Sequence, residues 1–116
     1  MRGFFEFGSP MIRLPVSGKT VGMILDTGFN GSLMLSANLI EELSLEQIGV
    51  SDYTSASGSG HVTKVYLGKI LFLGEVVEVP VLSASADFSL AGMELFSKSR
   101  IIVEASKGVV EVSKSE

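Results

Sequence analysis

The sequence predicts an all-β, mainly antiparallel fold on three observations. Short runs rich in Val, Ile, Leu and Phe recur along the 116 residues. Turns of Gly, Ser or Pro separate these runs at roughly regular spacing, and only two short stretches have helical character. With 46% apolar residues, a chain of this length can bury a core without disulfides. We therefore expect one domain spanning residues 1–116.

Individual elements follow from the apolar runs and from the turns between them. Glycine turns at 17–19, 57–60, 73–75 and 106–108 predict hairpins. A helix is expected over Ser36–Leu43, with Ser36 as N-cap and Leu39, Ile40 and Leu43 on one face. Gly92–Ser97 predicts a turn or a second short helix. The expected strands are Met11–Val16, Thr20–Leu25, Ser32–Leu35, Val50–Ala56, His61–Leu73, Val76–Ser83, Ile101–Glu104 and Gly108–Val112.

Composition excludes several classes of function. There is no Cys, the net charge is -4 and no basic run is present, which argues against a thiol site and against nucleic acid as a partner. No oxygen-ligand cluster predicts a metal, and we expect no cofactor. No apolar run approaches the roughly 18 residues of a membrane span, and Met1–Gly8 lacks a signal-peptide pattern. We therefore expect a cytoplasmic protein that does not bind membranes.

Asp26 is the most unusual residue in this pattern. It directly follows the apolar run Val21–Leu25, where a carboxylate needs compensating hydrogen-bond donors. Thr27 offers a hydroxyl, and Gly28 permits a tight turn that directs N–H groups at the carboxylate. From these residues alone, Asp26 is either a carboxylate held rigidly for chemistry or the end of a strand in an Asx-type turn.

Two longer segments carry a resemblance to a known family. The segment Asp26–Leu35 resembles the active-site loop of the retropepsin-like aspartic peptidases, in particular bacterial and archaeal members with Asp-Thr-Gly-Phe-Asn-Gly. Leu90–Phe96 resembles the late glycine segment of the same family, and the two occur in the family's order. The resemblance implies a closed acid-protease barrel with one or two short helices, forming half of a two-fold dimer.

The same resemblance implies the chemistry. The family has one Asp-Thr-Gly per chain of this length, so the active enzyme is a homodimer with Asp26 from each subunit. Two adjacent carboxylates share one proton and activate a water that hydrolyses a peptide bond. By resemblance, Thr27 bonds across the dimer axis and Gly28 lets the backbone of a peptide or protein substrate approach. The implied activity is an aspartic endopeptidase without a metal.

The resemblance also nominates a flap and reveals departures from the pattern. Tyr53–Val65 occupies the place of the mobile hairpin that covers substrate. The expected substrate-binding positions are Asn30 and the tip residues Ser57, Gly58, Ser59 and Gly60. Asn30 and Met93 stand where retroviral members have a salt bridge, so Arg13 or Arg100 would have to compensate. The terminal dimer sheet could use Met1–Phe7 or Gly108–Val112.

Other functions stay open at this point. The same fold could bind peptides as a catalytically silent dimer, because a fold does not determine function. A carboxylate-dependent glycosidase would need a second acid about 5–10 Å from Asp26 in the same chain, and no residue is clearly nominated. The many serines lack a well-placed histidine, so no serine nucleophile is predicted.

Overall fold

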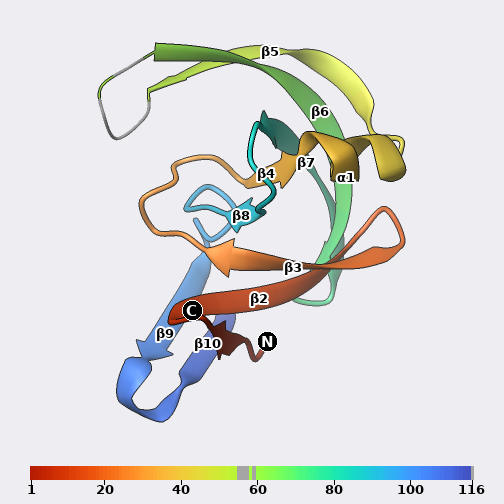
Figure 1. Ribbon diagram of the computed structural model, residues 1–116. Coiled ribbons are helices and arrows are strands. Elements are labelled where there is room, and N and C mark those ends of the chain that lie inside the picture. The colour runs from red at the N-terminus through yellow and green to blue at the C-terminus, as the bar shows by residue number, and fades with distance from the viewer. Residues whose placement is uncertain (55–57, 59, 116) are drawn as a thin grey trace.

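Strands make up most of the computed structural model, which describes residues 1–54, 58 and 60–115 (Figure 1). One short helix, α1 (Ala37–Glu42), follows the fourth strand, and a 3-10 turn (Ala105–Lys107) joins the last two. The strands are β1 (Phe4–Glu6), β2 (Ser9–Val16), β3 (Lys19–Leu25), β4 (Leu33–Ser36), β5 (Glu46–Thr54), β6 (Gly60–Phe72), β7 (Glu75–Ala84), β8 (Leu90–Ala91), β9 (Ser99–Glu104) and β10 (Val109–Lys114).

The main sheet closes into a barrel, as the sequence predicted. Its strand order is β1-β2-β3-β8-β4-β7-β6-β5. A pairing of Val16 with Ile70 joins β2 to β6 and closes the ring, which leaves β1 and β5 outside it. Most neighbours are antiparallel, but β3 pairs with β8, and β4 with β7, in parallel. Closure removes most of the exposed sheet edge that an open sheet would present.

The core fills this barrel through strand alternation. Ile12, Leu14 and Val16 of β2 are almost completely buried, and every second residue of β3 is buried as well. The N-cap predicted for the helix is present, since the Leu39 N–H donates to Ser36 Oγ at 3.2 Å and Ile40 is buried below it. This alternation gives β3 one buried face and one solvent-accessible face. It therefore determines toward which side of the sheet Asp26, the residue that follows β3, points.

A separate hairpin of β9 and β10 extends from the barrel. Val110 and Val112 belong to the buried core, so β10 is anchored to the barrel. The first three residues pair with β10 through an isolated bridge between Arg2 and Glu111. The Gly3 N–H donates to the Val110 oxygen at 2.8 Å, and the Arg2 side chain pairs with Glu111. The N-terminal residues therefore pair with β10 of the same chain. The sequence had left open which of these two segments would form a terminal sheet.

The structure corrects several element predictions. Strands β1 and β8 were not among the predicted strands. Strand β8 has only two residues, which are too few to show an alternation of apolar and polar side chains. The strand predicted to begin at Val50 begins at Glu46. Its first two residues are polar and lie at the edge of the sheet, so no apolar run in the sequence marked them as part of a strand. Of the two alternatives predicted for Gly92–Ser97, a turn or a short helix, the structure has the turn. Among the described residues, no helix is long and apolar enough to cross a membrane.

Candidate active site

Asp26 lies where β3 leaves the barrel. Its N–H donates to the Ala91 oxygen at 2.9 Å, which extends the pairing of β3 with β8 by one residue. The side chain is half-buried, and the Gly28 N–H donates to its Oδ1 at 2.9 Å. The Asx-type turn considered above is therefore present. It holds the carboxylate in a defined orientation without hiding it from solvent.

The loop after Asp26 is held against the late glycine segment. Strand β8 lies between β3 and β4, so the connection from Asp26 to Ser32 crosses its end. Three backbone bonds tie the two segments, with Gly92, Met93 and Glu94 donating to the oxygens of Ser32, Phe29 and Gly31 at 2.9, 2.8 and 3.2 Å. The two motifs that carried the resemblance, distant in sequence, therefore meet in space.

Gly92 permits this contact because it has no side chain. A Cβ at this position would lie 2.2 Å from the Gly31 oxygen and 2.5 Å from the Phe29 ring. Gly31 is similar, since its Cβ would lie 2.6 Å from the Phe29 ring. The ring of Phe29 thus sits between two glycines. The sequence did not predict this contact of Phe29, because Gly92 lies more than sixty positions further along the chain.

The remaining predicted loop residues are exposed. Thr27, Gly28 and Asn30 lie on the surface of this chain. Asn30 and Met93 make no side-chain bond to each other among the described residues, and the backbone bond of Met93 to Phe29 links their segments instead. The Arg13 guanidinium lies 3.9 Å from the centroid of the Phe4 ring. Arg100 is exposed on β9.

The β5–β6 hairpin contains the described part of Tyr53–Val65, the segment predicted as the flap. It arches above the barrel toward the side where β3 ends (Figure 1). Gly58 and Gly60 are exposed, and Gly58 has a positive φ of 86°. Ser57 and Ser59 lie outside the described residues, so their predicted role is untested.

Apolar side chains lie further down the same arm. Val62 is 73% exposed. By strand alternation it shares a face of β6 with Tyr66 and Ile70, both of which pack on the barrel core. Val50 of β5 is also exposed and lies opposite Lys64 on this face. The sequence analysis missed this apolar pair because it considered only the polar tip of the hairpin.

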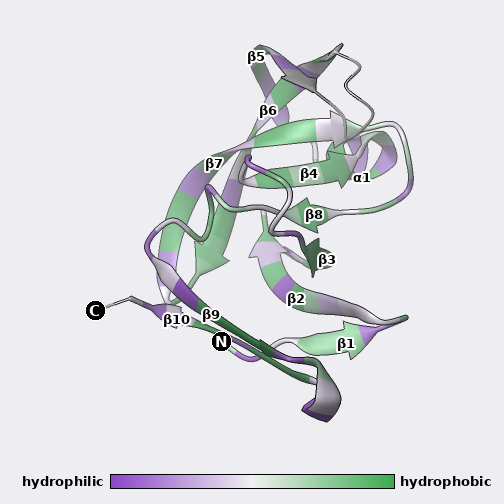
Figure 2. Ribbon diagram, turned by 90° about the vertical axis from the view of Figure 1, so that its left-hand side faces the viewer, coloured by the Kyte–Doolittle hydropathy of each residue, from purple (hydrophilic) through white to green (hydrophobic). Residues whose placement is uncertain are grey.

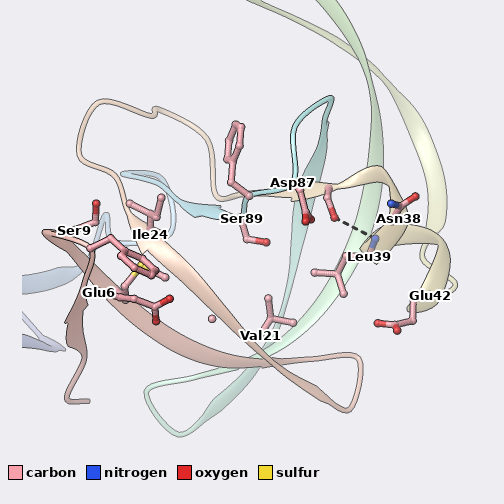
Figure 3. A pocket seen from close by; sticks show the side chains of 14 residues that line it. Glu6, Ser9, Val21, Ile24, Asn38, Leu39, Glu42, Asp87 and Ser89 are labelled. Atoms are coloured by element: carbon pink, nitrogen blue, oxygen red, sulfur yellow. Dashed lines mark hydrogen bonds between the residues drawn. The ribbon is translucent and has the colours of Figure 1, made fainter.

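A hollow of about 590 Å³ runs along the accessible face of β3. Ile24 lines it, and by alternation Ile24 and Asp26 point to the same side of the strand. Phe88 contributes an exposed ring to the lining. Glu6, Glu42 and Asp87 contribute carboxylates (Figure 3). Asp26 itself does not line the hollow. The alternation of β3 was the sequence signal that could have identified Ile24.

Among the described residues, no group of three or more Asp, Glu or His side chains is placed to hold a metal ion.

The barrel matches solved structures of aspartic proteases. A retropepsin-like aspartic protease from Rickettsia conorii superposes with a TM-score of 0.70 at 16% identity, over 95% of this chain and 86% of that one. EIAV protease, solved with the inhibitor HBY-793, gives a TM-score of 0.63 at 17% identity over 77% of this chain and 86% of that one. The chain has the retropepsin fold. The resemblance found in the sequence is thereby confirmed at the level of fold.

The protease of simian foamy virus (mac) extends this comparison. It gives a TM-score of 0.55 at 20% identity, covering 75% of this chain and 91% of that one. No protein-family model and no curated protein matches the sequence. Since the identities are low, the retropepsin fold is what these likenesses establish.

Proposed function

We propose that the protein is an aspartic endopeptidase whose site is completed by a second copy of the chain. The observation that carries the proposal is the geometry of Asp26 in a retropepsin fold. Its carboxylate is half-buried at the end of a barrel strand and is oriented by the Gly28 N–H at 2.9 Å. One chain supplies one such carboxylate, and water activation of this kind requires two. A homodimer would supply the second.

In this mechanism the two Asp26 carboxyls share one proton. The ionised carboxylate takes a proton from a bound water, whose oxygen attacks the scissile carbonyl carbon. The protonated partner donates a hydrogen bond to the carbonyl oxygen. As the tetrahedral intermediate collapses, a proton passes to the leaving amine and the C–N bond breaks. Exposed Thr27 would bond across the two-fold axis and hold both loops at the required separation.

An extended peptide is the substrate that suits the surrounding surface. Its backbone would pair along the cleft like an added strand, beneath the β5–β6 arm. The apolar residues Val50 and Val62 would cover it from above, and the hollow beside Ile24 would take a side chain. Because Phe88 and Ile24 are apolar while Glu6 and Asp87 are acidic, this hollow favours an apolar side chain or a long one with a cationic end.

The decisive experiment compares wild type with Asp26→Asn on a diverse peptide pool, from about pH 3 to pH 8 and at high protein concentration. We expect wild type to cleave and the mutant to be inactive, with both folded by circular dichroism. Asn keeps the size and the acceptor oxygen but cannot take the water proton. Equal cleavage by both proteins would remove Asp26 from the mechanism.

A catalytically silent peptide-binding dimer is the second candidate. It is favoured by Asn30 and Met93, which leave the two active-site loops without the salt bridge of the retroviral pattern. If a folded dimer binds peptides from the pool but cuts none at any pH, this candidate replaces the peptidase. A strict monomer in light scattering would leave the peptidase proposal without its second carboxylate.

A further inference from the structure

A second hollow lies on the outer side of the barrel, along β7, and the proposed activity does not use it. Its volume is about 580 Å³, which is within the range of small-molecule sites. Its lining comes from β7, from the turns after Gly92 and from the end of β10. Figure 2 shows β7 and β10 on the same side of the molecule. This hollow shares no lining residue with the hollow beside Ile24.

Ser32 gives the β7 hollow a polar group that the fold leaves unused. The residue is only 4% exposed, and it lines the hollow. Its hydroxyl forms no hydrogen bond with a described residue. Because no fully buried side-chain oxygen in the described part of the chain lacks a partner, the Ser32 Oγ must be accessible from the hollow. Such a hydroxyl is available to a molecule that enters the hollow.

The end of the hollow next to Ser32 carries negative charge. The Glu94 N–H donates to the Gly31 oxygen at 3.2 Å, which places Glu94 beside Ser32. The register of β4 with β7, continued by one residue, brings Pro80 level with Ser32. Glu78 lies two residues before Pro80 and therefore on the same face of β7. Both glutamates are exposed, and neither forms an ion pair with a described residue.

The opposite end of the hollow carries positive charge. Lys98 and Lys114 lie together there, since the N–H of Ser115 donates to the Lys98 oxygen at 3.0 Å. Lys114 pairs with Glu75 at 3.2 Å, whereas Lys98 forms no ion pair with a described residue. From Glu75 to Glu78, β7 rises by about 10 Å. The acidic and basic ends are therefore separated by about the length of an extended tripeptide.

Between its charged ends, the hollow is apolar. The apolar lining residues are partly buried and pack against the barrel core from this side, and they are Phe72, Leu73, Val77 and Leu95. Their accessible surface would be removed from water by an aliphatic side chain placed over it. The hollow therefore complements a molecule with opposite charges at its two ends and an apolar middle.

We propose that the β7 hollow binds short peptides of about three residues with free termini and aliphatic side chains. The ammonium group of the peptide lies between Glu78 and Glu94 and donates to the Ser32 Oγ, and its carboxylate lies beside Lys98. Ser32 ends the loop that begins at Asp26, so a bound peptide contacts that loop. The site does not depend on the proposed activity, because none of its residues takes part in water activation.

Isothermal titration calorimetry with the tripeptide Leu-Ala-Leu tests the class of ligand. The free tripeptide is compared with its N-acetylated and C-amidated forms, each of which lacks one terminal charge. We expect the free form to bind and each blocked form to bind about tenfold more weakly, since each loses a charge-assisted contact. Equal affinities for the three forms, or no binding of the free form at about 5 mM, would overturn the proposal.

Charge removal in the protein assigns each terminus of the peptide to its partner. Glu78→Gln should weaken binding of the free tripeptide about tenfold but should not affect the N-acetylated form, which has no ammonium group to lose. Lys98→Gln should show the same selectivity toward the C-amidated form. Glu41→Gln, on the exposed face of α1 and outside the hollow, should leave all affinities unchanged. If Glu78→Gln weakens the free and acetylated forms equally, the contact with the ammonium group is wrong.

Ser32→Ala completes the test, because the hydroxyl has no partner among the described residues. We expect the melting temperature to be unchanged and binding of the free tripeptide to weaken about fivefold. A loss of affinity confined to variants of the hollow supports the proposal even if the protein cuts no peptide, in which case the peptidase proposal alone fails. Binding that is indifferent to Ser32→Ala, Glu78→Gln and Lys98→Gln would place the peptide elsewhere and overturn the proposal.

Discussion

At the residue scale, the placement of Asp26 depends on neighbours that carry no functional group. Gly92 lets the loop from Asp26 to Ser32 pack directly on the end of β8, and a Cβ there would lie 2.2 Å from the Gly31 oxygen. Because the opposing atom belongs to the backbone, a side-chain rotation cannot relieve the overlap. The position of the loop that bears Asp26 therefore depends on the absence of a side chain at Gly92.

We therefore predict that Gly92→Ala lowers the free energy of unfolding by about 3 kcal/mol through overpacking. The same change should reduce peptide cleavage in the fraction that remains folded, because the loop must move. Urea denaturation and single-temperature kinetics would measure both effects. Gly22→Ala is the matched control, since nothing lies within 4 Å of a Cβ built there. An equal loss of stability in the two variants would contradict the explanation.

Thr27 gives a second prediction at this scale. Its side chain is exposed in the single chain, so its hydroxyl contributes little to the stability of one subunit. If the hydroxyl bonds across the two-fold axis, Thr27→Val should raise the dimer dissociation constant by about tenfold, whereas Thr27→Ser should retain affinity. Analytical ultracentrifugation would measure this difference. Equal dissociation constants for both variants would exclude a role for the hydroxyl.

At the scale of the element, the β5–β6 arm combines a polar tip with apolar side chains on its barrel-facing side. Strand β6 is long enough to contribute to the ring and then to continue beyond it. Tyr66 and Ile70 mark the part of this face that covers the core, and Val62 lies on its continuation. Under the proposed function, Val62 would contact the bound peptide and lose its exposure to water.

Val62→Thr should accordingly raise KM for peptides by about fivefold while leaving thermal stability unchanged. The substitution preserves the branched shape and adds a hydroxyl, so it removes favourable apolar contact with substrate and little else. Steady-state kinetics and thermal melts are the measurements. Val76→Thr on β7, with a similar exposure of 63%, should alter neither quantity. A drop in melting temperature for Val62→Thr alone would indicate a structural role instead.

Some strands of this fold could be predicted from the sequence, and others could not. Longer strands such as β2, β3 and β7 could be predicted because alternating burial imposes a period of two on their residues. The two residues of β8 could not, because tertiary pairing alone makes them a strand. The position of Asp26 directly after a strand could be predicted from the apolar run that precedes it. The contact of Phe29 with Gly92 could not, because it joins segments more than sixty positions apart.

At the scale of the whole molecule, a single chain builds a closed barrel but only half of the proposed site. The ring from β2 through β6 is complete within one subunit. The chain should therefore fold as a monomer and become active as its concentration rises. Among the described residues, β3 is followed by the carboxylate of Asp26, whereas its parallel neighbour β8 is followed by Gly92, which has no side chain.

Mixing wild type with Asp26→Asn tests this shared site. If both chains pair at random at a fixed total concentration, an equal mixture should retain about one quarter of the wild-type activity, because only dimers with two aspartates cleave. Chains that act alone would retain about one half. The mixture must be equilibrated long enough for subunits to exchange, which light scattering of diluted samples can establish. Because the mutant is folded in both cases, the difference between a quarter and a half reports only on how many Asp26 side chains each active site uses.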